Sequence, residues 1–162
     1  MGKLYVAYGS NLNIAQMALR CPTARIHGTG QLTNWELIYR GSPVNSYATI
    51  HRKSGSQVPV VVWEIQEADE QSLDRYEGYP RFYFKQNVIV SFPHGREKAM
   101  VYIMDTRRCP GLPSVTYTET IRQGYIDNDL DLSFFEESLR KCRIECRNCL
   151  LYTSDAADEA RS

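Results

Sequence analysis

The sequence lacks the features that would place the protein in a membrane, in a secretion pathway or on nucleic acid. Nineteen Lys and Arg balance nineteen Asp and Glu, so no excess positive charge is available to bind nucleic acid or an anionic lipid surface. The longest apolar runs, such as residues 58–63, are far shorter than the roughly 18 residues that suggest a membrane span. The N-terminus has no succession of basic, apolar and small residues like that of a secretory signal. We therefore expect a cytoplasmic protein without a nucleic-acid or membrane partner.

The sequence also lacks a recognisable metal or cofactor motif. Its three histidines, at positions 27, 51 and 94, are far apart, and no acidic residue is spaced to complete a metal site with them. Cys142, Cys146 and Cys149 have the C-x3-C-x2-C spacing of some iron–sulfur enzymes, but there the motif lies near the start of a large barrel. An odd number of cysteines, five, without a secretory signal favours free thiols in a reducing compartment. We expect no metal and no cofactor.

The last residues differ in character from the rest of the chain. Residues 149–159 read CLLYTSDAADE, which resembles the translation of a transposon mosaic-end adapter used to prepare sequencing libraries. They show no core pattern, so the sequence predicts one domain over residues 1–147 and an artefactual, disordered tail over residues 148–162. With 43% hydrophobic residues, the chain can bury a substantial core.

Strand-like and helical patterns follow one another without a linker or an internal repeat. Expected strands are 3–7, 25–40, 47–53, 58–65, 82–92 and 97–104, with hairpin turns at 54–57 and 93–96 and a bend at 27–30. Expected helices are 12–20, 67–76, 116–127 and 132–145. These elements predict an α+β fold: a small mixed β-barrel with short helices at its rim.

Residues Tyr8, Gly9, Ser10, Asn11 and Leu12 lie where the first strand gives way to a helix. The first N–H groups of a helix have no partner within it and can bind an anion, and Gly9 allows a ligand to approach the backbone closely. Ser10 and Asn11 add short polar side chains. A capped turn without any ligand would show the same spacing, so both interpretations stay open.

Glu77 is the second candidate site residue. It follows Leu73 by four positions, at the edge of the apolar side of its helix. A carboxyl group desolvated by aromatic neighbours has a raised pKa, which suits a general acid or base near neutral pH. A solvated carboxylate at a helix end would show the same periodicity. The aromatic neighbours in the sequence are Tyr76, Tyr79, Phe82, Tyr83 and Phe84.

Other candidates have less support from the pattern. Cys21 precedes Pro22 in an expected turn, but no base is spaced to activate it as a nucleophile, so a structural thiol is favoured. Tyr117 and Tyr125 lie on one expected helix, where they could bind a ligand or pack as aromatic residues of the core or rim. Motifs of serine hydrolases, phosphate-binding loops and dinucleotide-binding domains do not occur in the sequence.

Two segments together resemble a known family. LYVAYGSNL at residues 4–12 resembles the N-terminal signature of the gamma-glutamylcyclotransferase family, and SLDRYEGYP at residues 72–80 resembles the segment that carries its catalytic glutamate. The resemblance covers roughly residues 3–130, in the family's order. YGSNL is moderately specific alone, and the pair of motifs is strongly so.

The resemblance implies a small barrel with one cavity and no cofactor. The loop at residues 8–12 would hold the α-carboxylate and amine of a γ-glutamyl compound, and Glu77 would act as general base and acid in releasing 5-oxoproline. Tyr117 would contact the substrate. Alternatives are a cyclotransferase for γ-glutamylamines or another γ-glutamyl-protected metabolite, a binding module without catalysis, a structural interaction protein, and a truncated chain that folds poorly. The sequence does not identify the leaving group or the oligomeric state.

Overall fold

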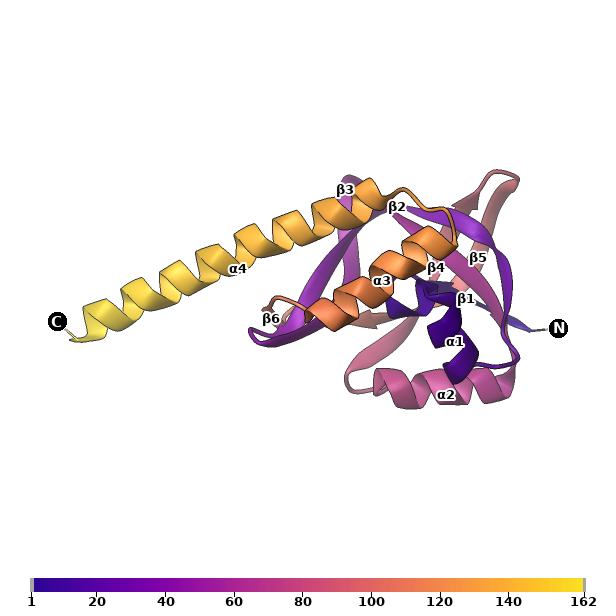
Figure 1. The fold of residues 1–162 in the computed structure, drawn as a ribbon, viewed down its shortest axis with the longest axis horizontal. Helices are drawn as coiled ribbons and strands as arrows, with labels where there is room; N and C mark the ends of the chain where they lie inside the picture. The colour runs from indigo at the N-terminus through magenta and orange to yellow at the C-terminus, as the bar shows by residue number, and fades with distance from the viewer. Residues whose placement is uncertain (1, 162) are drawn as a thin grey trace.

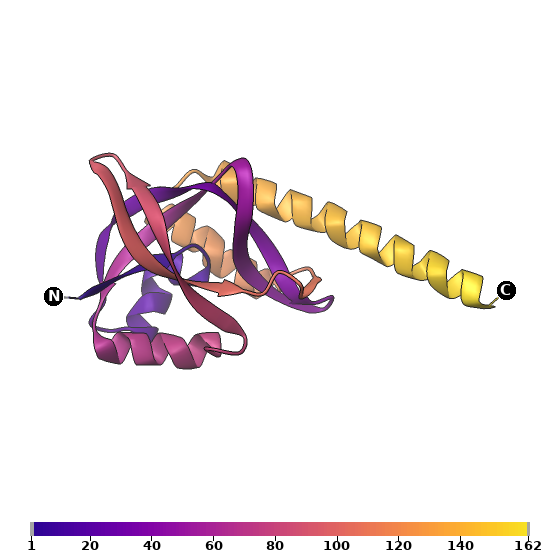
Figure 2. The same cartoon turned by 180° about the vertical axis from the view of Figure 1, so that it is seen from behind.

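The computed structural model describes the backbone of residues 2–161 and the side chains of residues 2–148. Its strands form a closed mixed barrel in the order β3-β1-β5-β4-β2, and an additional pairing between β2 and β3 completes the ring. β1 and β5 run parallel, whereas the other pairs are antiparallel, and β6 adds to the outer edge of β2 (Figures 1 and 2). The strands are β1 (Lys3–Ala7), β2 (Arg25–Ser42), β3 (Asn45–Ile65), β4 (Tyr83–Phe92), β5 (Gly95–Met104) and β6 (Cys109–Pro110). The predicted fold class is confirmed.

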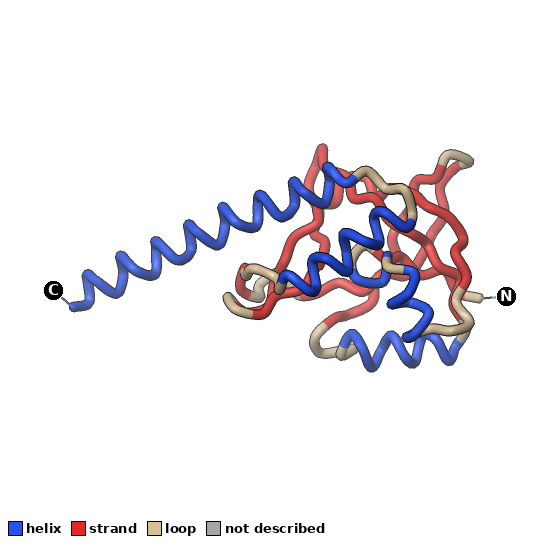
Figure 3. Tube along the Cα trace, viewed as in Figure 1, coloured by secondary structure: helices blue, strands red, loops and turns tan. Residues whose placement is uncertain are grey.

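The helices lie outside the barrel (Figure 3). α1 and α3 pack against each other and against η1, while α2 packs against α1. In Figure 1, α4 begins beside α3 and its C-terminal part extends away from the barrel. None of the described helices is long and apolar enough to cross a membrane. The helices are η1 (Ser10–Leu12), α1 (Ile14–Arg20), α2 (Glu67–Glu77), α3 (Val115–Asp127) and α4 (Leu132–Arg161).

The hairpin expected within residues 47–65 is wrong. β3 is one long strand that stays paired with β2 along its length. Residues 53–56 form an irregularity, where the register shifts from Thr33↔Gln57 to Trp35↔Arg52. Opposite it, the Asn34 side chain accepts a hydrogen bond of 3.0 Å from the Gly55 backbone N–H. The glycine and serine residues at positions 54–56 therefore lie at a corner that β2 and β3 share. This corner bends the sheet into a barrel.

The start and the end of α2 are set by local chemistry. Asp69 accepts a hydrogen bond of 2.9 Å from the backbone N–H of Gln66, which closes the first turn. At the other end, Gly78 adopts a left-handed conformation with φ 65°, which favours glycine. The helix therefore ends at Glu77, whose position at the C-terminus brings its side chain to the barrel opening.

The C-terminal helix differs from the expectation of a disordered tail. α4 is helical as far as Arg161, well beyond the expected end at residue 145. Buried side chains anchor its first part to the core: Phe135, Leu139, Cys142 and Cys146. The side chains from residue 149 onward lie outside the described residues, and the adapter origin of this segment stays a prediction.

Candidate active site

The loop between β1 and α1 carries two buried polar residues. Ser10 and Asn11 are only 8% and 3% exposed. Asn11 is fixed from two directions, because its amide group donates to the Tyr5 hydroxyl at 2.9 Å and its backbone carbonyl accepts from the Trp63 indole at 3.1 Å. The helix that follows is capped by Asn13, whose side chain accepts from the Gln16 N–H at 2.9 Å. The barrel thus holds these polar groups in place before any ligand binds.

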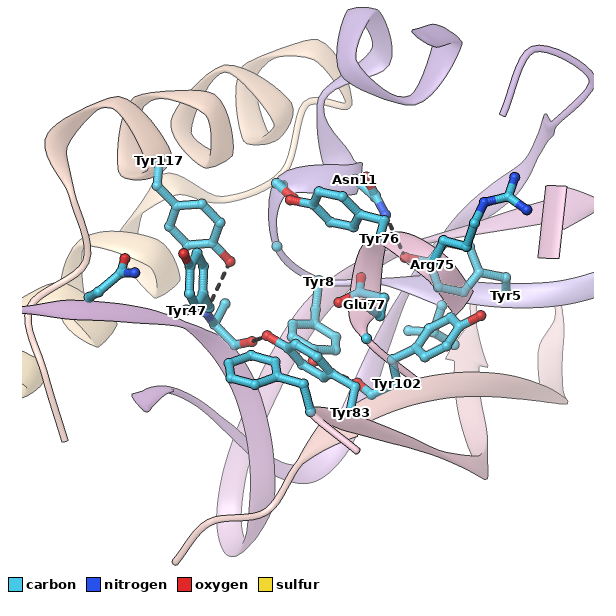
Figure 4. Close-up of a pocket in the computed structure, with 17 residues that line it drawn as sticks. Tyr5, Tyr8, Asn11, Tyr47, Arg75, Tyr76, Glu77, Tyr83, Tyr102 and Tyr117 are labelled. Atoms are coloured by element: carbon cyan, nitrogen blue, oxygen red, sulfur yellow. Dashed lines mark hydrogen bonds between the residues drawn. The ribbon is translucent and has the colours of Figure 1, made fainter. Parts of the chain in front are cut away.

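A cavity of about 550 Å³ lies beside this loop (Figure 4). Its volume is in the range of sites for small molecules. Strands, helices and loops from widely separated parts of the sequence contribute to its wall. Its lining residues are Tyr5, Val6, Tyr8, Gly9, Ser10, Asn11, Asn45, Tyr47, Ala48, Arg75, Tyr76, Glu77, Gly78, Phe82, Tyr83, Tyr102 and Tyr117.

The Glu77 carboxyl lies near the middle of these side chains in Figure 4. Burial raises the pKa of Glu77 to about 7, and the positive charge of Arg20 opposes that rise. Among the described residues, no side chain or backbone group forms a hydrogen bond with this carboxyl. Near neutral pH, Glu77 is therefore divided between its ionised and protonated forms and is free to exchange a proton with a bound molecule.

Tyrosine side chains surround Glu77 and remain protonated. Burial, together with the charge of Glu77, raises the pKa of Tyr5, Tyr8, Tyr83 and Tyr117 well above the usual value. Each phenol therefore keeps its proton at neutral pH, and the hydroxyls of Tyr5 and Tyr117, which act as acceptors in their bonds to Asn11 and Ala48, can donate to a ligand. The cavity combines one titratable carboxyl group with neutral donors, which is suited to moving a proton between atoms of a bound ligand.

Two of these tyrosines hold the backbone of Ala48 at the cavity wall. The Tyr83 hydroxyl donates to the Ala48 carbonyl at 2.7 Å, and the Tyr117 hydroxyl accepts from the Ala48 N–H at 3.0 Å. Because Tyr117 is the acceptor in this bond, its own proton stays available. The Tyr8 hydroxyl donates to the Tyr102 carbonyl at 2.6 Å. These bonds fix the rings in orientation around the cavity.

The structure brings most of the expected site residues together. Glu77, Tyr117 and the segment 8–11 line one cavity. Leu12 does not, because its side chain is fully buried in the hydrophobic core. Cys21 is also buried, and burial raises the pKa of its thiol to about 11, in line with a structural thiol.

Sequence reasoning missed several residues of the cavity wall. Tyr5, Tyr47 and Tyr102 lie on strands, where the alternation of apolar residues is also typical of core positions. Arg20, which lies outside the cavity wall, was also missed because it occupies the last position of a short surface helix. Among residues whose side chains are described, no group of three or more His, Cys, Asp and Glu could hold a metal ion. Cys149 of the C-x3-C-x2-C pattern lies outside those residues.

The closed barrel thus carries a small-molecule cavity in which a carboxyl group with a raised pKa lies beside a polar loop. The profile of the family described as gamma-glutamyl cyclotransferase, AIG2-like, matches residues 5–121. This chain therefore belongs to the gamma-glutamyl cyclotransferase family.

Similar proteins agree with that assignment. The gamma-glutamylcyclotransferase of Bos taurus is 31% identical over 140 residues, which are 81% of this chain and 74% of that protein. The Homo sapiens gamma-glutamylcyclotransferase is 30% identical over 142 residues, 83% of this chain and 76% of that one. A solved structure of a gamma-glutamyl cyclotransferase superposes with a TM-score of 0.76 at 29% identity, covering 85% of this chain and 86% of that chain. YkqA from Bacillus subtilis shares the fold, with a TM-score of 0.75 at 19% identity over 88% of this chain and 54% of that chain.

Proposed function

We propose that the protein is a γ-glutamyl cyclotransferase in which Glu77 is the general base and general acid. The observation that carries this proposal is the placement of Glu77, with a pKa raised to about 7, in a cavity beside the Tyr8–Asn11 loop. The products are 5-oxoproline and a free amino acid or amine. Family membership supports the activity, and the geometry supports the role of Glu77.

The reaction begins with the ionised form of Glu77. Its carboxylate takes a proton from the α-ammonium group of the substrate, and the resulting amine attacks the γ-carbonyl carbon of the same molecule. The bond between that carbon and the leaving nitrogen then breaks as Glu77 returns the proton to the leaving nitrogen. Two protons move in total, because the attacking nitrogen changes from an ammonium group to an amide N–H and the leaving nitrogen from an amide N–H to an ammonium group. Glu77 accepts each proton from the attacking nitrogen in turn and passes it to the leaving nitrogen, so the departing amine is released as an ammonium ion. Glu77 begins and ends the cycle ionised.

The protein's main contribution is to position the substrate. Nucleophile and electrophile belong to one molecule, and holding them in a reactive geometry can supply up to roughly 7–11 kcal/mol of the barrier. In this proposal the substrate's α-carboxylate binds to the loop at residues 8–11, which lines the cavity. A general base is most effective when its pKa lies near the working pH, as that of Glu77 does.

The test is release of 5-oxoproline by the purified full chain, measured by mass spectrometry. The substrates are a panel of γ-glutamyl dipeptides and γ-glutamylamines, which also identifies the leaving group. We expect Glu77→Gln to lower kcat/KM by at least a hundredfold, because glutamine cannot accept the proton.

Glu67→Gln is the matched control, since Glu67 lies exposed in the first turn of the same helix. It should retain wild-type activity. A folded Glu77→Gln protein with undiminished release would overturn the role of Glu77. Absence of release from folded wild-type protein across the panel would favour a binding module of the same fold.

A further inference from the structure

Arg20 connects the two parts of the site from outside the cavity wall. Its guanidinium group donates to the Ser10 hydroxyl at 3.1 Å and to the Asn11 side-chain carbonyl. The same group stacks on the ring of Tyr76, with 3.4 Å between the guanidinium carbon and the ring centroid. Tyr76 directly precedes Glu77 on α2. One side chain at the end of α1 therefore contacts both the polar loop and the residue next to the proposed base.

The contacts of Arg20 are of a kind that fix orientation. A guanidinium group is planar, presents its donors in a rigid fork and stacks flat on aromatic faces. An ammonium group is a compact point charge without these properties. The hydroxyl of Tyr76 also lies 3.4 Å from the Ser10 hydroxyl, which closes a small ring of contacts between loop, arginine and helix. Figure 4 shows Asn11 and Tyr76 adjacent, on the same side of the Glu77 carboxyl.

We propose that Arg20 is a positioning residue of the active site, which locks the polar loop to α2 and places a fixed positive charge near the Glu77 carboxylate. This inference rests on the proposed function, because it assigns Arg20 a part in the proton transfer of Glu77. Within residues 2–148, no carboxylate lies within ion-pair distance of the Arg20 guanidinium. Its charge is therefore not cancelled by direct contact.

Apart from Glu77, the one charged side chain in the lining of the described cavity is Arg75, which does not contribute to the pKa shift of Glu77. The buried phenols on β1, β4 and α3 are neutral at physiological pH, as their raised pKa values indicate. The positive charge of Arg20 lowers the pKa of Glu77, whereas burial raises it. The titratable and charged groups around the carboxyl are Tyr5, Tyr8, Arg20, Tyr47, Arg75, Tyr76, Tyr83, Tyr102 and Tyr117.

Two substitutions separate the charge of Arg20 from its geometry. Arg20→Gln removes the charge but keeps an amide donor for the loop. The pKa of Glu77 then rises, and because the base must be ionised, the acidic limb of the kcat/KM profile moves upward by about one pH unit. At pH values below that limb, kcat/KM of Arg20→Gln should be roughly tenfold lower than that of wild type, and by about pH 9 the two should be equal.

Arg20→Lys keeps the charge but loses the forked donors and the flat stacking surface of the guanidinium group. The acidic limb should therefore stay in place, while KM rises at every pH.

The experiment measures kcat/KM for 5-oxoproline release between pH 5 and 9 in wild type and both variants. A carbon-13 NMR titration of the Glu77 carboxyl, assigned by its absence in Glu77→Gln, gives a second reading that does not need catalysis. The control is Arg52→Gln, because the exposed Arg52 also stacks on an aromatic ring, that of Trp35 at 4.7 Å, away from the cavity. It should leave both readings unchanged.

The outcomes distinguish this inference from the proposed function. If wild type releases no 5-oxoproline, the proposed function fails, and the NMR titration still decides whether Arg20 controls the ionisation of Glu77. If Arg20→Gln changes neither the acidic limb nor the titration, the role of the charge is overturned. If Arg20→Gln does not fold, Arg20→Lys still decides, since wild-type KM in that variant would overturn positioning by the guanidinium group.

Discussion

At the residue scale, the absence of a side chain at Gly9 leaves space between the polar loop and the opposite cavity wall. A Cβ atom at this position would lie 3.3 Å from the Cβ of Ala48 and 3.5 Å from the hydroxyl oxygen of Tyr117. Both neighbours belong to the cavity wall, so the missing side chain leaves space inside the site. The loop backbone is therefore open to the cavity at this residue, and the approach of a ligand there stays a prediction.

We predict that Gly9→Ala lowers kcat/KM for 5-oxoproline release by roughly tenfold, because a methyl group occupies space that the substrate needs. Steady-state kinetics and a thermal unfolding curve check this together. Gly28→Ala is the matched control, since its Cβ would meet only the Phe92 ring at ordinary contact distance, 3.4 Å. Equal kinetics for Gly9→Ala and wild type would show that the ligand does not approach this part of the loop.

The residues found from the sequence differ in kind from those that were missed. Glu77 and the segment 8–11 carry local signals: polar or acidic residues at the end of an element, next to Gly. Tyr5 and Tyr102 have no such signal, because a strand residue that lines a cavity has the same pattern as one in the core. The role of Arg20 depends on contacts with residues 10, 11 and 76, and only the folded chain brings these together.

At the element scale, strand boundaries were harder to predict than strand positions. Gly and Ser at residues 54–56 are typical of a hairpin turn, yet β3 continues through them because β2 pairs with it on both sides of the corner. Long-range pairing decided the structure here, and local turn preference did not. The hairpin of β4 and β5 was predicted correctly, because its turn at Pro93 and His94 lies where the two strands pair with each other in unbroken register.

The packing of α3 on η1 explains the buried position of Leu12. Gly124 of α3 faces this segment so closely that a Cβ atom would lie 2.5 Å from the Leu12 Cβ and 2.7 Å from the Asn13 backbone nitrogen. Backbone atoms cannot move aside as a flexible side chain can. The loop therefore depends on a glycine more than a hundred residues further along the chain.

We predict that Gly124→Ala destabilises the protein by about 1–3 kcal/mol, because α3 must shift away from η1 to relieve the overlap. The same shift should lower activity, since Tyr117 on α3 and the loop share one cavity. Chemical denaturation gives the free energy of unfolding. Gln123→Ala serves as control, because residue 123 is exposed on the same helix. A Gly124→Ala protein as stable as wild type would contradict the close packing described here.

At the scale of the whole molecule, closure of the barrel assembles the site. The polar loop follows β1, Glu77 ends α2, and Tyr117 lies in the first turns of α3, so three distant segments meet at one opening. The parallel pairing of β1 with β5 and the pairing of β2 with β3 complete the ring that holds them there. The site is therefore sensitive to any change that opens the ring or removes the helices packed on it.

The C-terminal helix divides into a part that supports the barrel and a part beyond it. Phe135, Leu139, Cys142 and Cys146 are buried against the core, and the Arg40 guanidinium pairs with Glu145 at 3.0 Å.

We predict that a chain ending at residue 148 keeps the stability and the 5-oxoproline release of the full chain, because these contacts all remain. A chain ending at residue 130 should lose several kcal/mol, since it exposes the core that Phe135 and Leu139 cover. Denaturation curves and kinetics of the three lengths test this, and lower activity or stability of the 1–148 chain would assign a role to the residues after 148.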